Sequence, residues 1–204
     1  MRIRAWLYDK FLLGLTGGWY AEVIERLPDG VKLLDVGIGT AGALLANGER
    51  VAAKDLHITG IDIDSDYIAC ARERLRGSGL EDRIDLRLES IYDHQGGPYA
   101  AVYFSASFMI LPEPEKALRH CMDLLSEGGR IFFTQTIQNK PSRWLERFKP
   151  LLGRLTSIEF GRVTYEQEFR NQIQAAGLEL ETFTALDTRG TQSYCLAVAR
   201  PKTG

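Results

Sequence analysis

Short apolar runs alternate with longer amphipathic segments over most of the chain. The runs that predict strands lie at 31–36, 58–62, 84–88, 99–105 and 130–135. Between them, apolar residues recur at helical spacing, most clearly over 65–75, where Ser65 is placed to cap the helix. Strands that alternate with helices in this way form a parallel sheet with helices on both faces. The pattern therefore predicts an α/β fold.

The two ends of the chain depart from this alternation. Residues 1–30 predict one or two helices in front of the first strand, which we interpret as an N-terminal helical cap. Near the other end, a helix that ends at Gly177 is followed by two alternating strands, 178–186 and 193–199. A chain of 204 residues with 45% hydrophobic residues can bury one full core but not two, so we interpret 1–204 as a single domain.

A glycine-rich loop directly follows the first predicted strand. The segment 37–42, GIGTAG, fits G-x-G-x-x-G, in which absent side chains let the backbone turn sharply and let a ligand approach the N–H groups. The second strand ends in Asp62, where a carboxylate can accept hydrogen bonds from both hydroxyls of a ribose. Asp35, just before the loop, would repel a phosphate but attract an ammonium group. Together these residues predict a site for a nucleoside with a compact zwitterionic arm.

At these residues the chain resembles the class I S-adenosylmethionine-dependent methyltransferases. The resemblance rests on DVGIGTAG at 35–42, GIDID at 60–64 and LLSEGGRIFFTQT at 124–136, and it covers roughly 31–200. It implies a Rossmann-like seven-stranded sheet, mostly parallel with the last strand antiparallel, and S-adenosylmethionine as the cofactor. It also implies that the cofactor-binding residues are Asp35, Gly37, Gly39, Thr40, Asp62, Ile63, Ser90, Ile91 and Ser105.

The methyl acceptor is expected above the carboxyl ends of the strands, where ligands of open α/β sheets bind. The loop 105–108 lies there, and it lacks the (Asp/Asn)-Pro-Pro-(Tyr/Phe) tetrad that the enzymes of this family acting on DNA bases often carry. We therefore expect a small-molecule acceptor with an oxygen or nitrogen nucleophile. Candidate residues for its pocket are Tyr8, Trp19, Ser105, Ser107, Gln135 and Tyr165.

The sequence offers no clear catalytic base or metal site. His57 precedes its strand and His120 lies in the middle of a predicted helix, so His94, in a loop, is the histidine best placed to approach the cofactor. The three cysteines are far apart and show no metal-ligand spacing. Because a sulfonium methyl group is already electrophilic, we predict metal-free transfer by positioning and exclusion of water.

Charge is distributed unevenly along the chain. The net charge of −2 and the pI near 6.0 give no general attraction to nucleic acid. Residues 1–13 carry a local charge of +2, and the segment 138–163, which we interpret as a basic aromatic lid insertion, carries +4 between 140 and 154. Both segments are expected to roof the active site, which favours an anionic or lipid-like acceptor or shallow peripheral contact with a membrane.

Several alternatives remain at this stage. Within the same fold, the acceptor is alternatively a phospholipid or an isoprenoid quinone at the membrane surface. An NAD(P)-dependent reductase would use the same glycines, but it must explain Asp35, and the chain lacks a catalytic Tyr-x-x-x-Lys. A non-catalytic nucleoside-binding protein would share the same residues. Since no signal peptide or spanning helix is found, we expect a cytoplasmic protein, with peripheral contact at the inner membrane face as the alternative.

Overall fold

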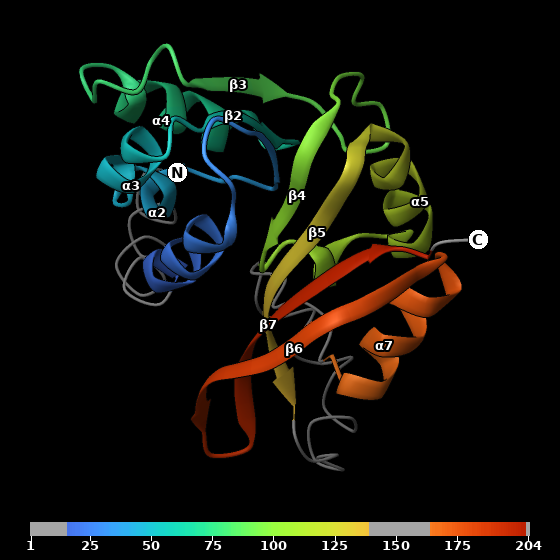
Figure 1. The fold of residues 1–204 in the computed structure, drawn as a ribbon. Helices are drawn as coiled ribbons and strands as arrows, with labels where there is room; N and C mark the ends of the chain where they lie inside the picture. Colours follow the sequence, from blue (N-terminus) through green and yellow to red (C-terminus); the bar gives the residue numbers. More distant parts are fainter. Residues whose placement is uncertain (1–15, 139–163, 203–204) are drawn as a thin grey trace.

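A single mixed sheet forms the centre of the protein. The computed structural model describes residues 16–138 and 164–202 (Figure 1). Seven strands pair in the order β3-β2-β1-β4-β5-β7-β6. They are β1 (Lys32–Val36), β2 (His57–Asp62), β3 (Ile84–Leu88), β4 (Tyr99–Ser105), β5 (Leu125–Gln138), β6 (Leu178–Arg189) and β7 (Gln192–Pro201). β1 to β5 run parallel, and β7 lies antiparallel between β5 and β6. The predicted Rossmann-like sheet is confirmed.

Helices cover both faces of the sheet, as predicted. They are a first helix at 16–26, α2 (Gly42–Leu45), α3 (Gly48–Ala53), α4 (Ser65–Leu75), the 3₁₀ turn η1 (Phe108–Ile110), α5 (Pro114–Leu124) and α7 (Glu166–Ala175). The helix 16–26 packs with α2, α3 and α4 on what we call the first face. On the opposite, second face lie α5 and α7 (Figure 1). The functional residues can therefore be assigned to one face or the other.

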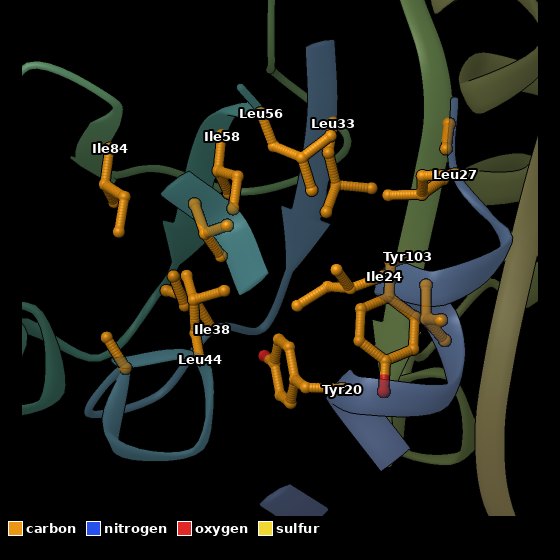
Figure 2. Packing of buried hydrophobic residues seen from close by; sticks show 14 of the residues in the cluster. Tyr20, Ile24, Leu27, Leu33, Ile38, Leu44, Leu56, Ile58, Ile84 and Tyr103 are labelled. Carbon is orange, nitrogen blue, oxygen red and sulfur yellow. The ribbon is translucent and has the colours of Figure 1, made fainter. Parts of the chain in front are cut away.

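The period of two along each strand divides the core between these faces. On β1, Leu33 packs on the first face and Leu34 on the second, and both are fully buried. Figure 2 shows the first-face cluster, in which side chains of the helix 16–26 meet those of β1, β2 and β4. Strands buried on both faces are expected to read as nearly continuous apolar runs, which is why these segments were recognisable in the sequence.

Two local predictions need correction. The helix α4 is capped by Asp64, not by Ser65: the Asp64 side chain accepts hydrogen bonds from the backbone N–H groups of Asp66 and Tyr67. An aspartate is the stronger cap because its charge also interacts favourably with the helix dipole. In addition, β5 begins at Leu125, five residues earlier than the predicted 130, because Leu125 pairs with Tyr99 before an irregularity in the ladder.

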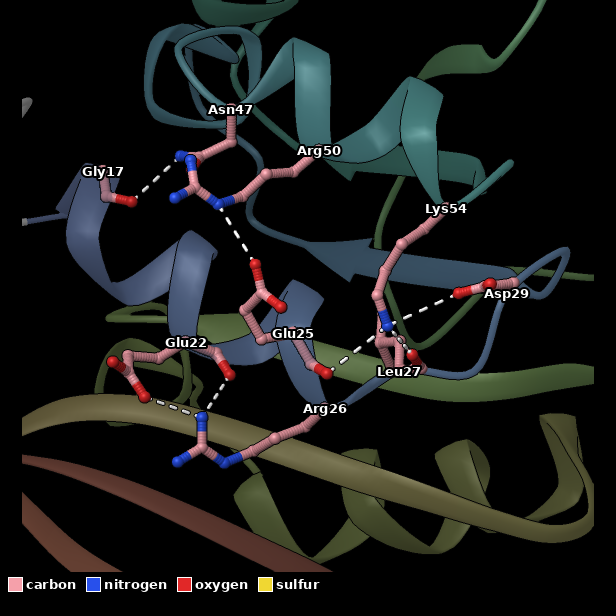
Figure 3. Close-up of polar contacts among 9 residues, drawn as sticks. All are labelled: Gly17, Glu22, Glu25, Arg26, Leu27, Asp29, Asn47, Arg50 and Lys54. Carbon is pink, nitrogen blue, oxygen red and sulfur yellow. Dashed lines mark hydrogen bonds and ion pairs between the residues drawn. The ribbon is translucent and has the colours of Figure 1, made fainter.

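The helix 16–26 is tethered to the segment 47–54 by polar contacts (Figure 3). The Asn47 amide donates to the Gly17 carbonyl oxygen at 2.9 Å, and Arg50 pairs with Glu25 at 3.3 Å. Lys54 donates to the carbonyl oxygen of Leu27 at the end of the helix. These contacts fix the described part of the predicted N-terminal cap. Residues 1–15 and most of the predicted lid at 138–163 lie outside the described residues, so the division of the domain stays a prediction.

Candidate functional site

The carboxyl ends of β1, β2 and β4 meet at one edge of the sheet, and the glycine loop lies there. The backbone N–H groups of Gly37 and Ile38 both donate to the Ile61 carbonyl oxygen, at 2.8 and 3.1 Å, which fastens the loop to β2. The Gly39 N–H donates to Asp62 Oδ2 at 2.9 Å. The structure therefore brings together the glycine loop and the carboxylate at the end of β2, which the sequence predicted to share a site.

Both carboxylate oxygens of Asp62 are oriented by the backbone. Oδ2 accepts from Gly39, and Oδ1 accepts from the Asp64 N–H at 2.9 Å. Burial raises the pKa of the Asp62 carboxyl, and these backbone hydrogen bonds lower it. Each carboxylate oxygen has a second lone-pair direction, so a fixed, half-buried Asp62 can still accept from two ribose hydroxyls.

Asp35 is a fully buried carboxylate with one oxygen satisfied and one not. Its Oδ2 accepts a 2.7 Å hydrogen bond from the Tyr20 hydroxyl, while its Oδ1 has no hydrogen-bond partner. Burial raises the pKa of Asp35 to about 7, which the Tyr20 hydrogen bond opposes and the nearby Asp62 charge reinforces. A buried acceptor without a donor is costly, and an ammonium group would supply both a donor and the opposite charge.

Further polar side chains gather beside Asp35 on the first face, and sequence reasoning did not select them. The Tyr20 ring packs edge-on against the Tyr103 ring at a centroid distance of 5.0 Å (Figure 2). The Tyr103 hydroxyl lies 2.7 Å from Thr134 Oγ1, and all three side chains are buried. Tyr20 falls on the helical stripe with Val23 and Leu27, a signal that could have identified it as inward-facing.

Two apolar side chains remain exposed next to Asp62. Ile63 is 77% exposed and Leu88, which pairs with Asp62 across the ladder, is 51% exposed. Exposed apolar side chains beside the ribose-binding carboxylate fit a flat base. The half-buried Ser90 hydroxyl accepts from the Tyr92 N–H at 3.3 Å and keeps its own proton for a ligand. The Ile91 side chain is instead buried in the second-face core, so its contact with a base would be through the backbone.

The loop after β4 lies directly against the glycine loop. The Ser107 hydroxyl donates to the Val36 carbonyl oxygen, and a Cβ at Gly37 would lie 2.5 Å from Ser107 Cβ. Gly37 also has φ +76°, which disfavours any side chain. Ala106 has φ 56°, a left-handed conformation that costs a non-glycine residue energy. Both loops are therefore held closely together, and Ser105, the last residue of β4, is half-buried.

The Gln135 side chain is buried but unsatisfied. It is 2% exposed, and neither its amide nitrogen nor its amide oxygen has a hydrogen-bond partner. Gln135 lies one residue beyond Thr134, the last residue of β5 that pairs with β4, and so at the carboxyl edge. Alternation from Phe133 places it on the second face. A fully unpaired buried amide is rare and requires an explanation.

The four remaining candidates lie at different places in the fold. Thr40 is buried and its hydroxyl accepts from Arg74 at 2.8 Å, so it braces the glycine loop against α4. Trp19 is buried against Tyr194, with ring centroids 5.9 Å apart. Tyr165 is half-buried and bridges to Gln138 at the end of β5. Tyr8 lies outside the described residues.

The histidines are placed as structural residues. His57 begins β2 at the amino edge of the sheet, as expected. His94 is fully buried, with Nδ1 bonded to Glu89 and Nε2 3.0 Å from the Tyr99 hydroxyl, while His120 bonds the His94 carbonyl oxygen. Both ring nitrogens of His94 are therefore engaged within the protein. Within 16–138 and 164–202, no group of three or more His, Cys, Asp or Glu side chains is placed to hold a metal ion.

The geometry at this edge fits a nucleoside with a zwitterionic arm better than it fits a phosphate. The unpaired oxygen of Asp35 would be stabilised by a cation. A Cβ at Gly39 would meet no described atom within 4 Å, so a ligand can approach the backbone there closely. A cavity of about 450 Å³ lies at the opposite edge, lined by residues such as Lys32, Arg83 and Asp85. It is at the amino ends of the strands, where open α/β sheets do not bind their ligands.

Replacing Asp62 by asparagine is expected to lower the affinity for S-adenosylhomocysteine by roughly 10- to 100-fold, the effect of losing hydrogen bonds to a charged group. The new amide would also face the Gly39 N–H as a second donor. Isothermal titration calorimetry measures the change. Asp66→Asn, at an exposed position in the first turn of α4, is the control and should bind as the unchanged protein does.

Comparisons with known proteins agree with this geometry. A family described as "Methyltransferase domain" matches residues 34–131. A protein of Acinetobacter baylyi named "Ubiquinone biosynthesis O-methyltransferase" is 30% identical over 178 residues, covering 82% of this chain and 72% of that protein.

Solved structures show the same fold. The cyclase SpnF superimposes with a TM-score of 0.75 at 20% identity, covering 92% of this chain and 82% of that one. The geranyl diphosphate C-methyltransferase from Streptomyces coelicolor A3(2) gives 0.69 at 14% identity, covering 90% and 78%. The family match and the 30% identical relative both favour a methyltransferase over the reductase alternative. The chain therefore belongs to the class I S-adenosylmethionine-dependent methyltransferases, and S-adenosylmethionine is its cofactor.

Proposed function

We propose that the protein methylates an oxygen of a small, largely apolar acceptor that carries a hydroxylated ring. The relatives named "Ubiquinone biosynthesis O-methyltransferase" support oxygen as the nucleophile and a quinone-type ring as the acceptor. This chain covers more than two thirds of the length of two of these relatives, 72% of one and 68% of the other. This choice develops the quinone alternative drawn from the sequence and sets nitrogen nucleophiles aside.

The observation that carries the proposal is the unpaired, buried amide of Gln135, two residues along β5 from Phe133 and on the same face of the sheet. The Phe133 ring packs against Phe108 and Phe169 at centroid distances of 5.0 and 5.2 Å, close to the strand position of Gln135. These buried rings make the second face beside Gln135 apolar, an environment that suits a largely apolar acceptor. The amide adds an NH2 donor group and a carbonyl acceptor, which suit an oxygen-bearing ring.

The protein's part in the reaction is to orient the two reactants and exclude water. The bound cofactor supplies a methyl group that is already electrophilic. Asp35 and Asp62 would hold the ends of the cofactor, and the loop 105–108 would place the acceptor oxygen opposite the methyl group. As the methyl–oxygen bond forms and the methyl–sulfur bond breaks, the proton of the acceptor hydroxyl passes to solvent, because both ring nitrogens of His94 are engaged within the protein.

The proposal is tested by turnover with a panel of acceptors. Purified protein is incubated with labelled S-adenosylmethionine and, separately, phenols, hydroquinones, amines, carboxylates and phospholipid vesicles. We expect methyl transfer to phenols or hydroquinones, with the product O-methylated by mass spectrometry. Turnover confined to amines or to phospholipids would contradict the proposal.

Gln135→Leu is expected to lower kcat/KM for an acceptor found in that panel by at least tenfold while the melting temperature stays the same or rises. The reason is that leucine removes an amide with no partner in the free protein. The matched control is Gln138→Leu on the same strand, where the amide donates to Thr191 Oγ1 at 2.9 Å. The control should lower the melting temperature and leave kcat/KM nearly unchanged.

Peripheral membrane contact through the basic segments 1–13 and 138–163 stays a prediction. Within the described part of the chain, no helix combines the length and apolar character needed to cross a bilayer. Liposome flotation with anionic vesicles at low and high salt tests the contact, which should weaken with salt if charge drives it. Absence of binding at low salt would contradict it.

A further inference from the structure

Asp35 presents its two carboxylate oxygens to different environments. Tyr20 from the helix 16–26 donates to Oδ2 at 2.7 Å, and Oδ1 has no partner although it is buried. The Tyr20 hydroxyl is therefore a direct hydrogen-bond partner of Asp35. It also comes from an element that precedes the family's sequence motifs, which begin at 35.

The surroundings of Asp35 contain no described cation. Two groups act on the charge of Asp35: Tyr20 from the helix 16–26 and Asp62 from β2. Tyr103 from β4 also lies near, because the charge of Asp35 raises the pKa of the Tyr103 hydroxyl. The negative charge of Asp62 disfavours the charged form of Asp35. Tyr20 is thus the one described residue that stabilises the Asp35 carboxylate through a side-chain hydrogen bond.

We propose that Tyr20 is a positioning residue for the cofactor: its hydroxyl holds one oxygen of Asp35 so that the other is directed at the cofactor's ammonium group. The hydrogen bond also favours the charged form of Asp35, the form that attracts an ammonium ion. The helix 16–26 is in this way part of the cofactor site, and not merely a cover for the core.

The position of Tyr20 does not depend on this hydrogen bond. The helix is anchored separately by Asn47 and Arg50 (Figure 3), and the Tyr20 ring is buried against Tyr103. Removing the hydroxyl alone should leave the helix and the ring in place. Tyr20→Phe therefore tests the hydrogen bond and not the fold.

Cofactor binding should then be linked to loss of a proton. Burial raises the pKa of Asp35 to about 7, so near that pH part of the free protein carries a proton on Asp35 that an incoming ammonium group must displace. Loss of the Tyr20 hydrogen bond raises the pKa further, because a hydrogen bond donated to a carboxylate favours its charged form. A larger share of the variant would be protonated at neutral pH.

The test is calorimetric binding of S-adenosylhomocysteine to the full chain between pH 6 and 8.5, in buffers of different ionisation enthalpy. We expect the unchanged protein to release roughly half a proton per cofactor near pH 7, the amount displaced when pH and pKa coincide. Tyr20→Phe should bind about tenfold more weakly at pH 7, as for a lost hydrogen bond to a charged group, and recover as the pH rises. Its proton release should persist to higher pH.

The matched control is Tyr103→Phe. This variant loses a buried hydroxyl from the same face, but one that bonds Thr134 instead of Asp35. It should keep the pH midpoint of binding seen in the unchanged protein. The proposal is overturned if Tyr20→Phe shows the same midpoint and proton release as the unchanged protein, or if Tyr103→Phe shifts them equally. The ligand's own ammonium titrates identically in every variant and cancels from the comparison.

Discussion

Replacing Asp35 by asparagine is expected to stabilise the free protein at pH 8 and to abolish tight binding of the cofactor. A rise of the pKa from 3.8 to about 7 corresponds to a penalty of roughly 4 kcal/mol for the charged form in the folded state. Asparagine removes that charge but leaves an unpaired amide hydrogen, which costs about 1–3 kcal/mol. The net gain of about 2 kcal/mol corresponds to a melting temperature higher by roughly 4–8 °C.

The stability difference between the two proteins should depend on pH in a defined window. The folded Asp35 binds a proton more tightly than the unfolded one, so its contribution to stability is present at pH 4 and is lost as the pH rises to about 7. Asp35→Asn should lack this decline, and its advantage should therefore grow from pH 4 to pH 7 and then level off. Thermal unfolding at a series of pH values measures it.

Asp35→Asn should weaken cofactor binding even though it stabilises the protein. Loss of a buried charged partner costs about 2–5 kcal/mol, so affinity for S-adenosylhomocysteine should fall by at least roughly 30-fold at pH 8. Asp123→Asn, at an exposed position on α5, is the control and should alter neither property. Tight binding by Asp35→Asn would contradict the role of Asp35 as the ammonium partner.

Gly37→Ala is expected to destabilise the protein and to remove methyl transfer. A methyl group at 37 would lie 2.5 Å from Ser107 Cβ, so the loop after β4 must move away from the glycine loop. The backbone at Gly37 also has φ +76°, which costs an alanine roughly 1–2 kcal/mol. With the clash added, we expect a loss of about 3 kcal/mol, a mid-range value for overpacking together with strain, measured by urea unfolding.

The control for backbone strain is Gly30→Ala. Gly30 has φ +71°, nearly the same as Gly37, but a Cβ there meets no described atom within 4 Å, and the residue lies in the turn before β1. Gly30→Ala should lose only the stability that backbone strain at positive φ costs, and its kcat should be unchanged. If Gly37→Ala and Gly30→Ala behaved alike in both measurements, the contact between the two loops would have no functional importance.

The predictions for Asp35 and Gln135 share a physical basis, since each residue lowers the stability of the folded protein at the site. The buried charge of Asp35 and the unpaired amide of Gln135 each destabilise the protein in the absence of ligands. The left-handed Ala106 adds backbone strain in the loop between them. Residues of this kind persist where a ligand restores the missing interactions, which is why they mark the site more clearly than the visible cavities do.

The strands and the cofactor loop could be predicted from the chain because their signals are local. Alternation identified β3 and a continuous apolar run identified β4, both with their observed bounds. The spacing from Gly37 to Asp62 placed these two residues at the same edge. The order of the strands followed from the resemblance to a known family and not from periodicity.

The partners across the sheet were decided by tertiary packing. That Tyr20 bonds Asp35, and that Tyr103 bonds Thr134, depends on how the helix 16–26 lies on the first face, which no local pattern specifies. Burial of the Ile91 side chain and the missing partners of Gln135 likewise depend on residues distant in sequence. Periodicity tells which way a side chain points, whereas hydrogen bonding and desolvation depend on everything that surrounds it.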